Sequence, residues 1–362
     1  MGILILERQV VVNNMASSEF VTGKIDWVKV RLPVSPQNVI EKFLGVDIDD
    51  CTLTDGKLVY YNYNGYFSYG LIQVYTYKDA PYIEDCILQM SGAACTQFLI
   101  MLENRSSSWS EFFKTIIVTN GNAEMLRLDV ALDDKNEKPY FLIKQLISKA
   151  KKALYWSNGR EYSIHESKYK LSTGKTLNIG ARTSDIMIRI YDKAIEQAKS
   201  SGVNISDYGS WNRVEIELKK EPANDMARRI AFEEDSLENL IRGVLREELR
   251  FYTDETKTKI AKSWDRFLLK VPPISLIRKY EVTTMESTVR WLEEQGPLAA
   301  YQAVVFLTEN KALGNLNDIT KQYQEFSRGL AERMIAHLVG IKREDLIPEV
   351  RARTKKEKKE GK

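Results

Sequence analysis

Three short segments alternate apolar and polar residues so regularly that they restrict the fold more than any other feature of the chain. They read MLRLDVALDD, IMIRIYDK and WNRVEIELKK, and they overlap the predicted strand segments Glu124–Asp133, Thr176–Ile190 (with a turn near Ala181–Asp185) and Trp211–Lys219. Successive side chains of a β-strand point to opposite faces, so a period of two predicts strands with one buried and one polar face. Because antiparallel sheets commonly pair a core face with a polar face, we expect an antiparallel sheet.

The alternation assigns the residues of each segment to one of two faces. The expected core face consists of Leu126, Leu128, Val130, Leu132, Ile186, Ile188, Ile190, Val214, Ile216 and Leu218. The opposite face collects the acids Asp129, Asp133, Glu215 and Glu217, the bases Arg127, Arg189, Arg213 and Lys219, and one phenol, Tyr191. If the three strands are neighbours, these charged groups share one surface of the sheet.

This charged face holds the groups that phosphodiester chemistry needs. Carboxylates bind hard divalent cations such as Mg²⁺ or Mn²⁺ through oxygen, and such a cation polarises a scissile phosphate while nearby bases hold its charge. The four acids are therefore the candidate metal ligands. Tyr191 is the candidate nucleophile, and at neutral pH its phenol needs a nearby cation that favours the phenolate. Arg189 and Lys193 are the local candidates for that role.

Other interpretations of the charged face are open. A solvated sheet face with opposite charges paired across strands would show the same alternation. Two carboxylates spaced i, i+2 on each of two strands disfavour it, because like charges this close repel unless a cation lies between them. A non-catalytic DNA-binding replication protein is the functional alternative. A tyrosine recombinase or topoisomerase fits less well, since such enzymes surround the tyrosine with arginine and histidine, and this chain has two histidines, His165 and His337.

Further strands and helices are predicted around the three segments. Lys24–Leu32 alternates as a strand, and Ser35-Pro36 supplies the N-cap and first-turn proline of a helix that Gly45 ends. The Asn64-Gly65 pair predicts a hairpin turn within an aromatic-rich stretch. Farther along, Ser236–Tyr252 is predicted as one helix.

The expected fold class is α+β, with antiparallel β-sheets, flanking helices, a catalytic sheet and a helical C-terminal region. We divide the chain into a loose N-terminus (1–22), an N-terminal α+β region (23–120), a catalytic sheet region (121–221), a helical region (222–345) and a basic tail (346–362). The tail is expected to be disordered, because its closing KKEKKEGK has no apolar residue to bury.

Composition limits the partners and the compartment only loosely. The net charge is +3, but the last residues, RARTKKEKKEGK, carry +5 of it, so DNA binding must depend on local patches of Lys and Arg. The three cysteines, Cys51, Cys86 and Cys95, form no metal-type cluster, and the apolar surroundings of Cys86 and Cys95 are typical of reduced core positions. We expect a cytoplasmic protein without a membrane segment.

Four stretches of the chain together resemble the replication initiation factor family. They are IDWVKV, MSGAACTQF, RLDVALDD, and TLNIGARTSDIMIRIYDKAIE followed by WNRVEIELKK, and they cover about Ile25 to Lys220. Each stretch alone is weak, but their joint occurrence in this order is specific. This family, the Rep_trans group, comprises rolling-circle plasmid initiators and relaxases of integrative conjugative elements.

The resemblance implies a metal-dependent nicking and closing enzyme for the origin DNA of a mobile element. Tyr191 would become linked to a 5′ phosphate at a single-stranded or hairpin nick site, and the free 3′ hydroxyl would prime rolling-circle replication or start conjugative transfer. The metal-binding acids would be Asp129 and Glu215 first, then Asp133 and Glu217. A homodimer and a host superfamily 1 helicase are the implied partners. The candidate DNA contacts are Arg127, Arg182 and Arg213, and the role of His165 stays open.

Overall fold

A computed structural model describes most of the chain as two compact units, Met1–Arg278 and Lys279–Lys362. The described residues are 21–58, 63–119, 123–159, 161–169, 172–278, 301, 305–306, 325–326, 328–340 and 342–354. Within these residues, no helix has both the length and the apolar character needed to cross a membrane.

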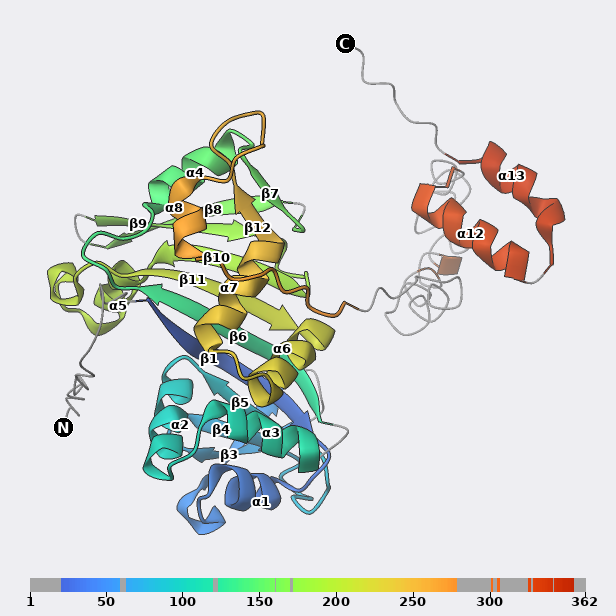
Figure 1. The fold of residues 1–362 in the computed structure, drawn as a ribbon. Coiled ribbons are helices and arrows are strands. Elements are labelled where there is room, and N and C mark those ends of the chain that lie inside the picture. Colours follow the sequence, from blue (N-terminus) through green and yellow to red (C-terminus); the bar gives the residue numbers. More distant parts are fainter. Residues whose placement is uncertain are drawn as a thin grey trace. The chain divides into compact units, whose positions relative to one another are not determined.

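One antiparallel sheet of ten strands organises the first unit (Figure 1). Its order is β2-β3-β4-β5-β1-β6-β11-β10-β9-β8. The strands are β1 (Val21–Leu32), β2 (Thr52–Leu58), β3 (Tyr63–Tyr69), β4 (Ile72–Thr76), β5 (Cys86–Ser91), β6 (Glu124–Asp134), β8 (Tyr162–Tyr169), β9 (Ser172–Ile179), β10 (Ile186–Asp192) and β11 (Asn212–Lys219). The predicted segments are thus β6, β9 with β10, and β11, and the expected α+β fold with an antiparallel sheet is confirmed.

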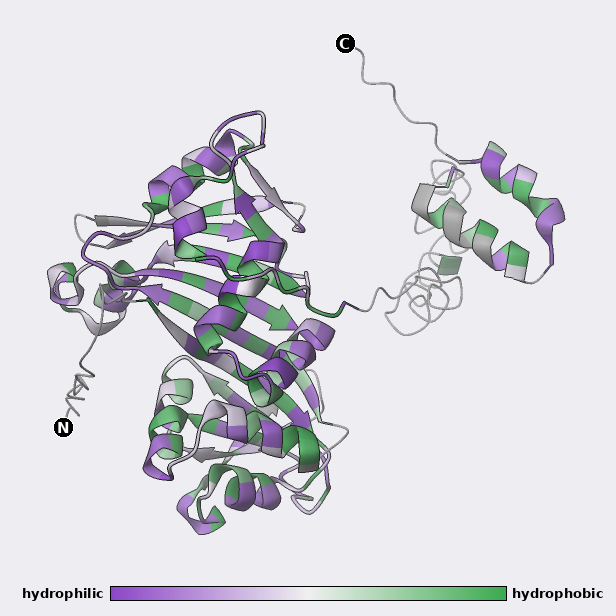
Figure 2. Ribbon diagram, in the orientation of Figure 1, coloured by the Kyte–Doolittle hydropathy of each residue, from purple (hydrophilic) through white to green (hydrophobic). Residues whose placement is uncertain are grey.

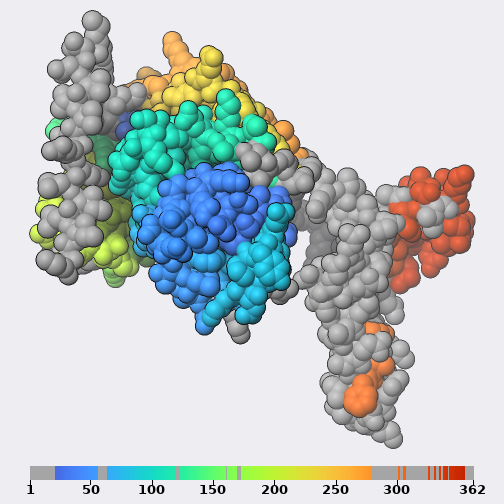
Figure 3. All heavy atoms as spheres, turned by 90° about the horizontal axis from the view of Figure 1, so that it is seen from below, coloured from blue at the N-terminus to red at the C-terminus, as the bar shows by residue number. Residues whose placement is uncertain are grey.

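Helices cover one face of this sheet and bury the apolar side of its strands. They are α1 (Pro36–Asn38, continued by a π-helix over Val39–Leu44), α2 (Ala93–Asn104), α3 (Trp109–Thr119), α4 (Ile143–Lys151), α6 (Lys220–Phe232), α7 (Leu237–Glu248) and α8 (Lys262–Phe267). The space-filling view shows α2 and α3 (teal) together with α6 and α7 (yellow) on one side of the unit (Figure 3). The first helix begins and ends as predicted, with Ser35 as N-cap and Gly45 in the left-handed conformation.

The core side of the sheet follows the predicted alternation. Ile188, Ile216 and Val130 lie side by side on β10, β11 and β6, and each is almost completely buried. Hydropathy alternates along these strands accordingly (Figure 2). The opposite face of β6, β11 and β10 therefore carries the charged residues.

Leu126 is an exception on β6, because it does not lie on the core face. The pairing with β1 shifts between Lys29–Arg127 and Val30–Met125, which marks a β-bulge. Met125 consequently takes the core position, whereas Leu126 packs with a small aromatic cluster around Tyr63 and Tyr75.

The hairpin turn predicted at Asn64-Gly65 is wrong, because both residues lie inside β3. The turn comes instead at Gly70, which has a φ of 58° and joins β3 to β4. Gly65 meets a packing need within the strand. A Cβ atom there would lie 3.0 Å from the Lys78 Cβ and 3.2 Å from the Thr54 carbonyl oxygen.

The helix predicted over Ser236–Tyr252 ends earlier than expected. Helix α7 stops at Glu248, and Leu249–Phe251 form β12, which pairs with β7 (Tyr155–Ser157) in a separate two-stranded sheet. The residues of β12 alternate buried, half-buried and buried, as a strand requires. This pairing partner lies far away in the sequence, so local helix signals did not reveal it.

The region expected to be helical (222–345) contributes to both units. Helices α6, α7 and α8 bury their apolar residues in the core of the first unit. In the second unit, α12 (Arg328–Gly340) is followed by a 3₁₀ turn (Glu344–Leu346) and by α13 (Ile347–Ala352). The expected disordered tail is therefore helical at its start, where Val350 is buried. Residues 279–300, 302–304, 307–324 and 355–362 lie outside the described part of the chain.

Candidate active site

The strand register brings the predicted site residues together on the face opposite the core. Tyr191 on β10 lies beside Arg213 on β11, and Arg213 lies beside Asp133 on β6. The next same-face row pairs Arg189 with Glu215, and the row after that pairs Glu217 with Asp129. A final row pairs Lys219 with Arg127. Alternation in the sequence therefore corresponds to contact across the sheet.

Tyr191 holds a defined position at the C-terminal end of β10. Its hydroxyl donates a hydrogen bond of 2.9 Å to Glu215 Oε2. Burial raises the pKa of this phenol, and the charge of Glu215 raises it further, whereas the charge of Arg213 lowers it. Ionisation of Tyr191 thus requires that Glu215 accept its proton or that more positive charge arrive.

Three carboxylates, Asp129, Glu215 and Glu217, converge on the guanidinium of Arg189, and we call them the acid cluster. Arg189 Nη2 lies 3.3 Å from Asp129 Oδ2 and 3.6 Å from Glu217 Oε2, and it also contacts Glu215 Oε1. Arg127 Nη2 lies 2.6 Å from Asp129 and 2.8 Å from Glu217. The three acids are only 1%, 3% and 6% exposed, which disfavours the interpretation of a solvated sheet face.

Burial and the bases Arg127, Arg189 and Lys219 affect the carboxyl groups of the acid cluster differently. Burial raises the pKa of Asp129 to about 7, and the charges of Glu215 and Glu217 act in the same direction against the hydrogen bonds from Arg127. Burial also disfavours the charged form of Glu217. However, the hydrogen bond from Lys219 and the charge of Arg127 outweigh it, so the pKa of Glu217 lies below its ordinary value.

Asp133 is separate from the acid cluster because Arg213 engages both of its oxygens. Arg213 Nε and Nη2 donate to Asp133 at 2.6 and 2.7 Å, and Nη1 donates to Asp26 at 2.7 Å. Burial alone would raise the pKa of Asp133, but the hydrogen bonds and charge of Arg213 hold it below its ordinary value. Arg213, predicted to contact DNA, is 2% exposed, and this geometry favours a supporting role beside Tyr191.

We expect the Arg213–Asp133 pair to be essential for stability. Replacing Arg213 with Met leaves the Asp133 carboxylate buried without its partner, which should lower the free energy of unfolding by about 3–5 kcal/mol. Urea denaturation of the full chain measures this loss. The control is Arg31→Met, which removes a pair with Asp85 from a half-exposed arginine and should cost less than about 1 kcal/mol. Equal losses for the two variants would contradict the prediction.

The acid cluster fits a hard divalent cation by the chemistry of its donors. Carboxylate oxygens on two neighbouring strands lie within 3.6 Å of one atom, Arg189 Nη2, and oxygen ligands of this kind bind Mg²⁺ and Mn²⁺. No group of three or more His, Cys, Asp or Glu in the described part of the chain is arranged as a ready-formed metal site. The position among the oxygens is taken by Arg189, so this arginine and a cation would compete for the same ligands.

The remaining predicted residues lie around this centre at different distances. Lys193 Nζ pairs with Glu196 at 2.7 Å and lies 5.7 Å from the centre of the Tyr191 ring. Arg182 is exposed in the turn between β9 and β10, at the opposite end of β10 from Tyr191. His165 lies in the same cross-strand row as Tyr191, two strands away on β8, and its Nε2 is 3.3 Å from Ser163 Oγ.

Asp26 is a site residue that the sequence pattern did not reveal. The pairing of β1 with β6 passes from Ile25–Val130 to Trp27–Asp129, so Asp26 is the extra residue of a second β-bulge. Its carboxylate thereby reaches Arg213. The available signal was an acid between two apolar residues, which alternation alone assigns to a solvent-facing position.

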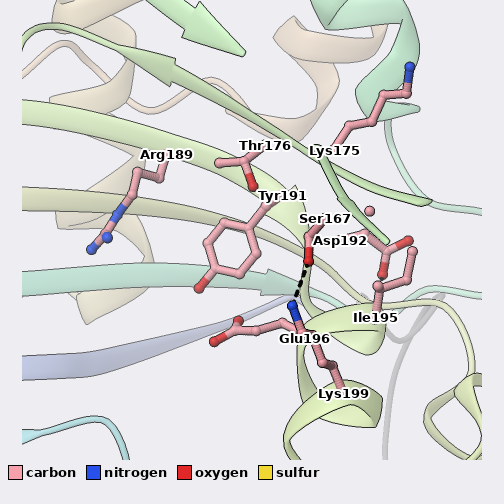
Figure 4. A pocket seen from close by; sticks show the side chains of 10 residues that line it. Ser167, Lys175, Thr176, Arg189, Tyr191, Asp192, Ile195, Glu196 and Lys199 are labelled. Carbon is pink, nitrogen blue, oxygen red and sulfur yellow. Dashed lines mark hydrogen bonds between the residues drawn. The ribbon is translucent and has the colours of Figure 1, made fainter. Parts of the chain in front are cut away.

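A pocket of about 320 Å³ opens beside Tyr191, between the β8–β9 hairpin and helix α5 (Lys193–Ser201) (Figure 4). It is lined by Ser167, Gly174, Lys175, Thr176, Arg189, Tyr191, Asp192, Ile195, Glu196 and Lys199. The phenol ring is part of its wall, and the hydroxyl points away from Lys175 and Ile195. The ring of the candidate nucleophile, rather than its hydroxyl, therefore borders a surface cavity.

Two family models and two relatives match this chain over most of its folded part. Residues 123–311, more than half of the chain, match the family described as "Replication initiation factor", and residues 22–115 match "Rolling Circle replication initiation protein N-terminal domain". The protein named "Putative DNA relaxase NicK" from Bacillus subtilis (strain 168) is 27% identical over 301 residues, which cover 80% of this chain and 82% of that protein.

A solved structure supports the same relationship. The rolling circle replication initiator protein from Geobacillus stearothermophilus superposes with a TM-score of 0.57 at 26% identity, covering 70% of this chain and 98% of that one. The matched residues include every strand of the site, and the family suggested by the sequence motifs is confirmed. The chain belongs to the replication initiation factor family of rolling-circle initiators and relaxases.

Proposed function

We propose that this chain nicks one strand of its origin DNA with Tyr191 and stays linked to the 5′ phosphate. The hydrogen bond from the Tyr191 hydroxyl to Glu215 Oε2 carries the proposal, because it pairs a nucleophile with a carboxylate able to take its proton. Arg189 and Arg213 lie on either side of this pair. A sheet that only binds DNA would not require a buried pair of a phenol and a carboxylate.

The bond changes of the proposed reaction balance without an external energy source. Glu215 accepts the phenolic proton as Tyr191 Oη attacks the phosphorus atom, and the bond from phosphorus to the 3′ oxygen breaks. The leaving 3′ oxygen keeps the bonding electron pair and takes a proton from water. Since one phosphoester replaces another, the 3′ hydroxyl can later attack the phosphotyrosine and reseal the strand. Initiation of rolling-circle replication or transfer follows from the free 3′ hydroxyl.

Asp129, Glu215 and Glu217 are the residues that would hold Mg²⁺ or Mn²⁺ in this proposal. When bound, the cation supplies positive charge that stabilises the developing charge on the scissile phosphate. The two Glu215 oxygens face different partners, since Oε1 contacts Arg189 and Oε2 accepts from Tyr191. Glu215 thus links the acid cluster to the nucleophile.

Covalent capture tests the proposal directly. The full chain is incubated with labelled single-stranded oligonucleotides from its element's candidate origin, with and without Mn²⁺, and denaturing gels reveal any adduct. Mass spectrometry then locates the attachment, which we expect on Tyr191 through a 5′ phosphate. Origin binding without an adduct under any metal condition would favour the non-catalytic alternative.

Arg189 gives a test of the acid cluster that does not depend on nicking. Arg189→Met removes the guanidinium that competes with a cation for the same oxygens, so affinity for Mn²⁺ should rise about tenfold while DNA nicking falls. Electron paramagnetic resonance of free Mn²⁺ measures the affinity. Arg182→Met, an exposed arginine away from the cluster, is the control and should leave Mn²⁺ affinity unchanged. Weaker Mn²⁺ binding by Arg189→Met would show that the arginine assists the site instead.

The proposal also includes the partners of this chain. Origin DNA is the substrate, and the family resemblance suggests in addition a homodimer and a host superfamily 1 helicase. Arg127 and Arg182 remain proposed phosphate contacts, and Arg127 also stacks over the Trp27 ring at 4.3 Å.

A further inference from the structure

The pocket beside Tyr191 adjoins the proposed nicking centre without sharing its acids. Neither Asp129, Glu217 nor Asp133 lines it, and the two regions share the side chains of Tyr191 and Arg189. Its walls come from β8, β9, β10 and α5, which meet here at the end of the sheet. A separate ligand group can therefore lie next to the reacting atoms.

The size and lining of the pocket suit one unpaired nucleotide. Small-ligand sites hold roughly 300–1,000 Å³, so about 320 Å³ gives enough room for one nucleotide. The Tyr191 ring and Ile195 offer apolar surface to a base or sugar. Gly174 and Ile195 lie close together in this lining, because a Cβ atom at Gly174 would lie 3.0 Å from Ile195 Cγ2.

The polar groups at the opening suit the phosphates on either side of that nucleotide. Lys199 Nζ donates to Ser167 Oγ at 3.0 Å, and this contact is drawn in Figure 4. Lys175 projects from β9 on the other side and pairs with Glu166 at 2.8 Å. Both lysines are exposed, so each can exchange its present contact for a phosphate oxygen without unfolding its strand or helix.

The direction of attack selects which nucleotide this is. In a displacement at phosphorus, the leaving oxygen lies roughly in line with the attacking oxygen on the far side of the phosphorus atom. The nucleotide that carries the leaving 3′ oxygen must therefore extend away from Tyr191. The nucleotide on the 3′ side of the nick keeps the phosphate through its 5′ oxygen and can lie beside the phenol ring.

Resting on the proposed nicking function, we propose that this pocket binds the first nucleotide 3′ of the nick as an unpaired residue. After cleavage this nucleotide remains attached to Tyr191. Holding its base and sugar keeps the phosphotyrosine aligned for resealing and limits diffusion of the attached strand.

A cycle of protein and DNA changes tests the assignment. The parent protein is full-length Tyr191→Phe with Mn²⁺, which allows binding without reaction, and the DNA is an oligonucleotide spanning the mapped nick site. Removing the base 3′ of the nick should weaken binding about tenfold in the parent, as loss of one stacked base does. In the double variant Tyr191→Phe, Ile195→Ala, removal of the same base should weaken DNA binding by less than about twofold.

Matched controls separate the pocket from general effects. Val118→Ala changes an apolar residue that is 69% exposed on α3, and it should leave the tenfold effect intact. Removing the base 5′ of the nick should weaken binding equally with and without Ile195→Ala. The pocket assignment would be overturned if removal of the 3′ base weakened binding equally with and without Ile195→Ala. It would also be overturned if Ile195→Ala changed the effect of removing the 5′ base. Failure of wild-type protein to form any adduct would instead overturn the nicking function on which it rests.

Discussion

Tyr191→Phe is expected to abolish nicking while leaving origin binding within about twofold of wild type. The substitution removes one oxygen, the proposed nucleophile, and keeps the ring that forms part of the pocket wall. Loss of a nucleophile without replacement lowers rates by at least about 1,000-fold. Single-turnover cleavage of a labelled origin oligonucleotide gives the rate, and fluorescence anisotropy of the same oligonucleotide gives the affinity.

A second tyrosine provides the control for this substitution. Tyr75 lies on β4, five strands away from β10 in the sheet, and its hydroxyl donates to Gln73 at 3.0 Å. Tyr75→Phe removes the same atom from the same kind of side chain and should cleave at the wild-type rate. Retained nicking by Tyr191→Phe would show that another residue attacks the phosphate.

Glu215→Gln is expected to lower the cleavage rate by about 10²–10⁴-fold, the usual contribution of a positioned base. The amide keeps the shape of the side chain but cannot accept the phenolic proton. It also removes a charge that raises the pKa of Tyr191, so the phenol of the variant should ionise more readily than in wild type. Activity of the variant should consequently recover in part as the pH rises, because hydroxide can then replace the missing base.

The pH profile distinguishes this role from a purely structural one. Single-turnover rates are measured from neutral to alkaline pH for wild type, Glu215→Gln and the control Glu124→Gln, an exposed acid at the start of β6. A uniformly low rate for Glu215→Gln with no alkaline recovery would assign Glu215 to metal binding or positioning alone. A wild-type rate would remove it from the site.

The strands and the charged face were predictable because both depend on a local period of two. That period holds without interruption at Asp129, Arg189 and Glu217. Once the strands pair antiparallel, the register of the pairing brings these side chains into contact. The family motifs identified Tyr191 within the same pattern. Sequence reasoning therefore captured the residues of β6, β10 and β11 that share a face with Tyr191.

What the sequence did not reveal depends on distant partners. The bulge of β1 shifts Asp26 toward Arg213, and the bulge of β6 turns Leu126 away from the core. No residue type in the local sequence indicates either bulge. The sequence predicts Gly65 as a turn residue, whereas in the structure it leaves room for the Lys78 side chain to pack against the strand. The sequence also did not show which arginine contacts which acid. Only the folded sheet shows that Arg213 binds Asp133 whereas Arg189 contacts the acid cluster.

The pairing of β1 with β6 determines whether the part of the chain that begins at β6 and carries Tyr191 can fold alone. The two matched family regions, 22–115 and 123–311, divide the chain between these strands, yet the strands are hydrogen-bonded neighbours in the middle of one sheet. A fragment beginning at β6 would expose that strand as a long, unprotected edge of apolar residues, which favours aggregation. It would also lose the Asp26 contact to Arg213. The proposed nicking centre therefore depends on the N-terminal half of the sheet, and transferring it to another protein requires that half as well.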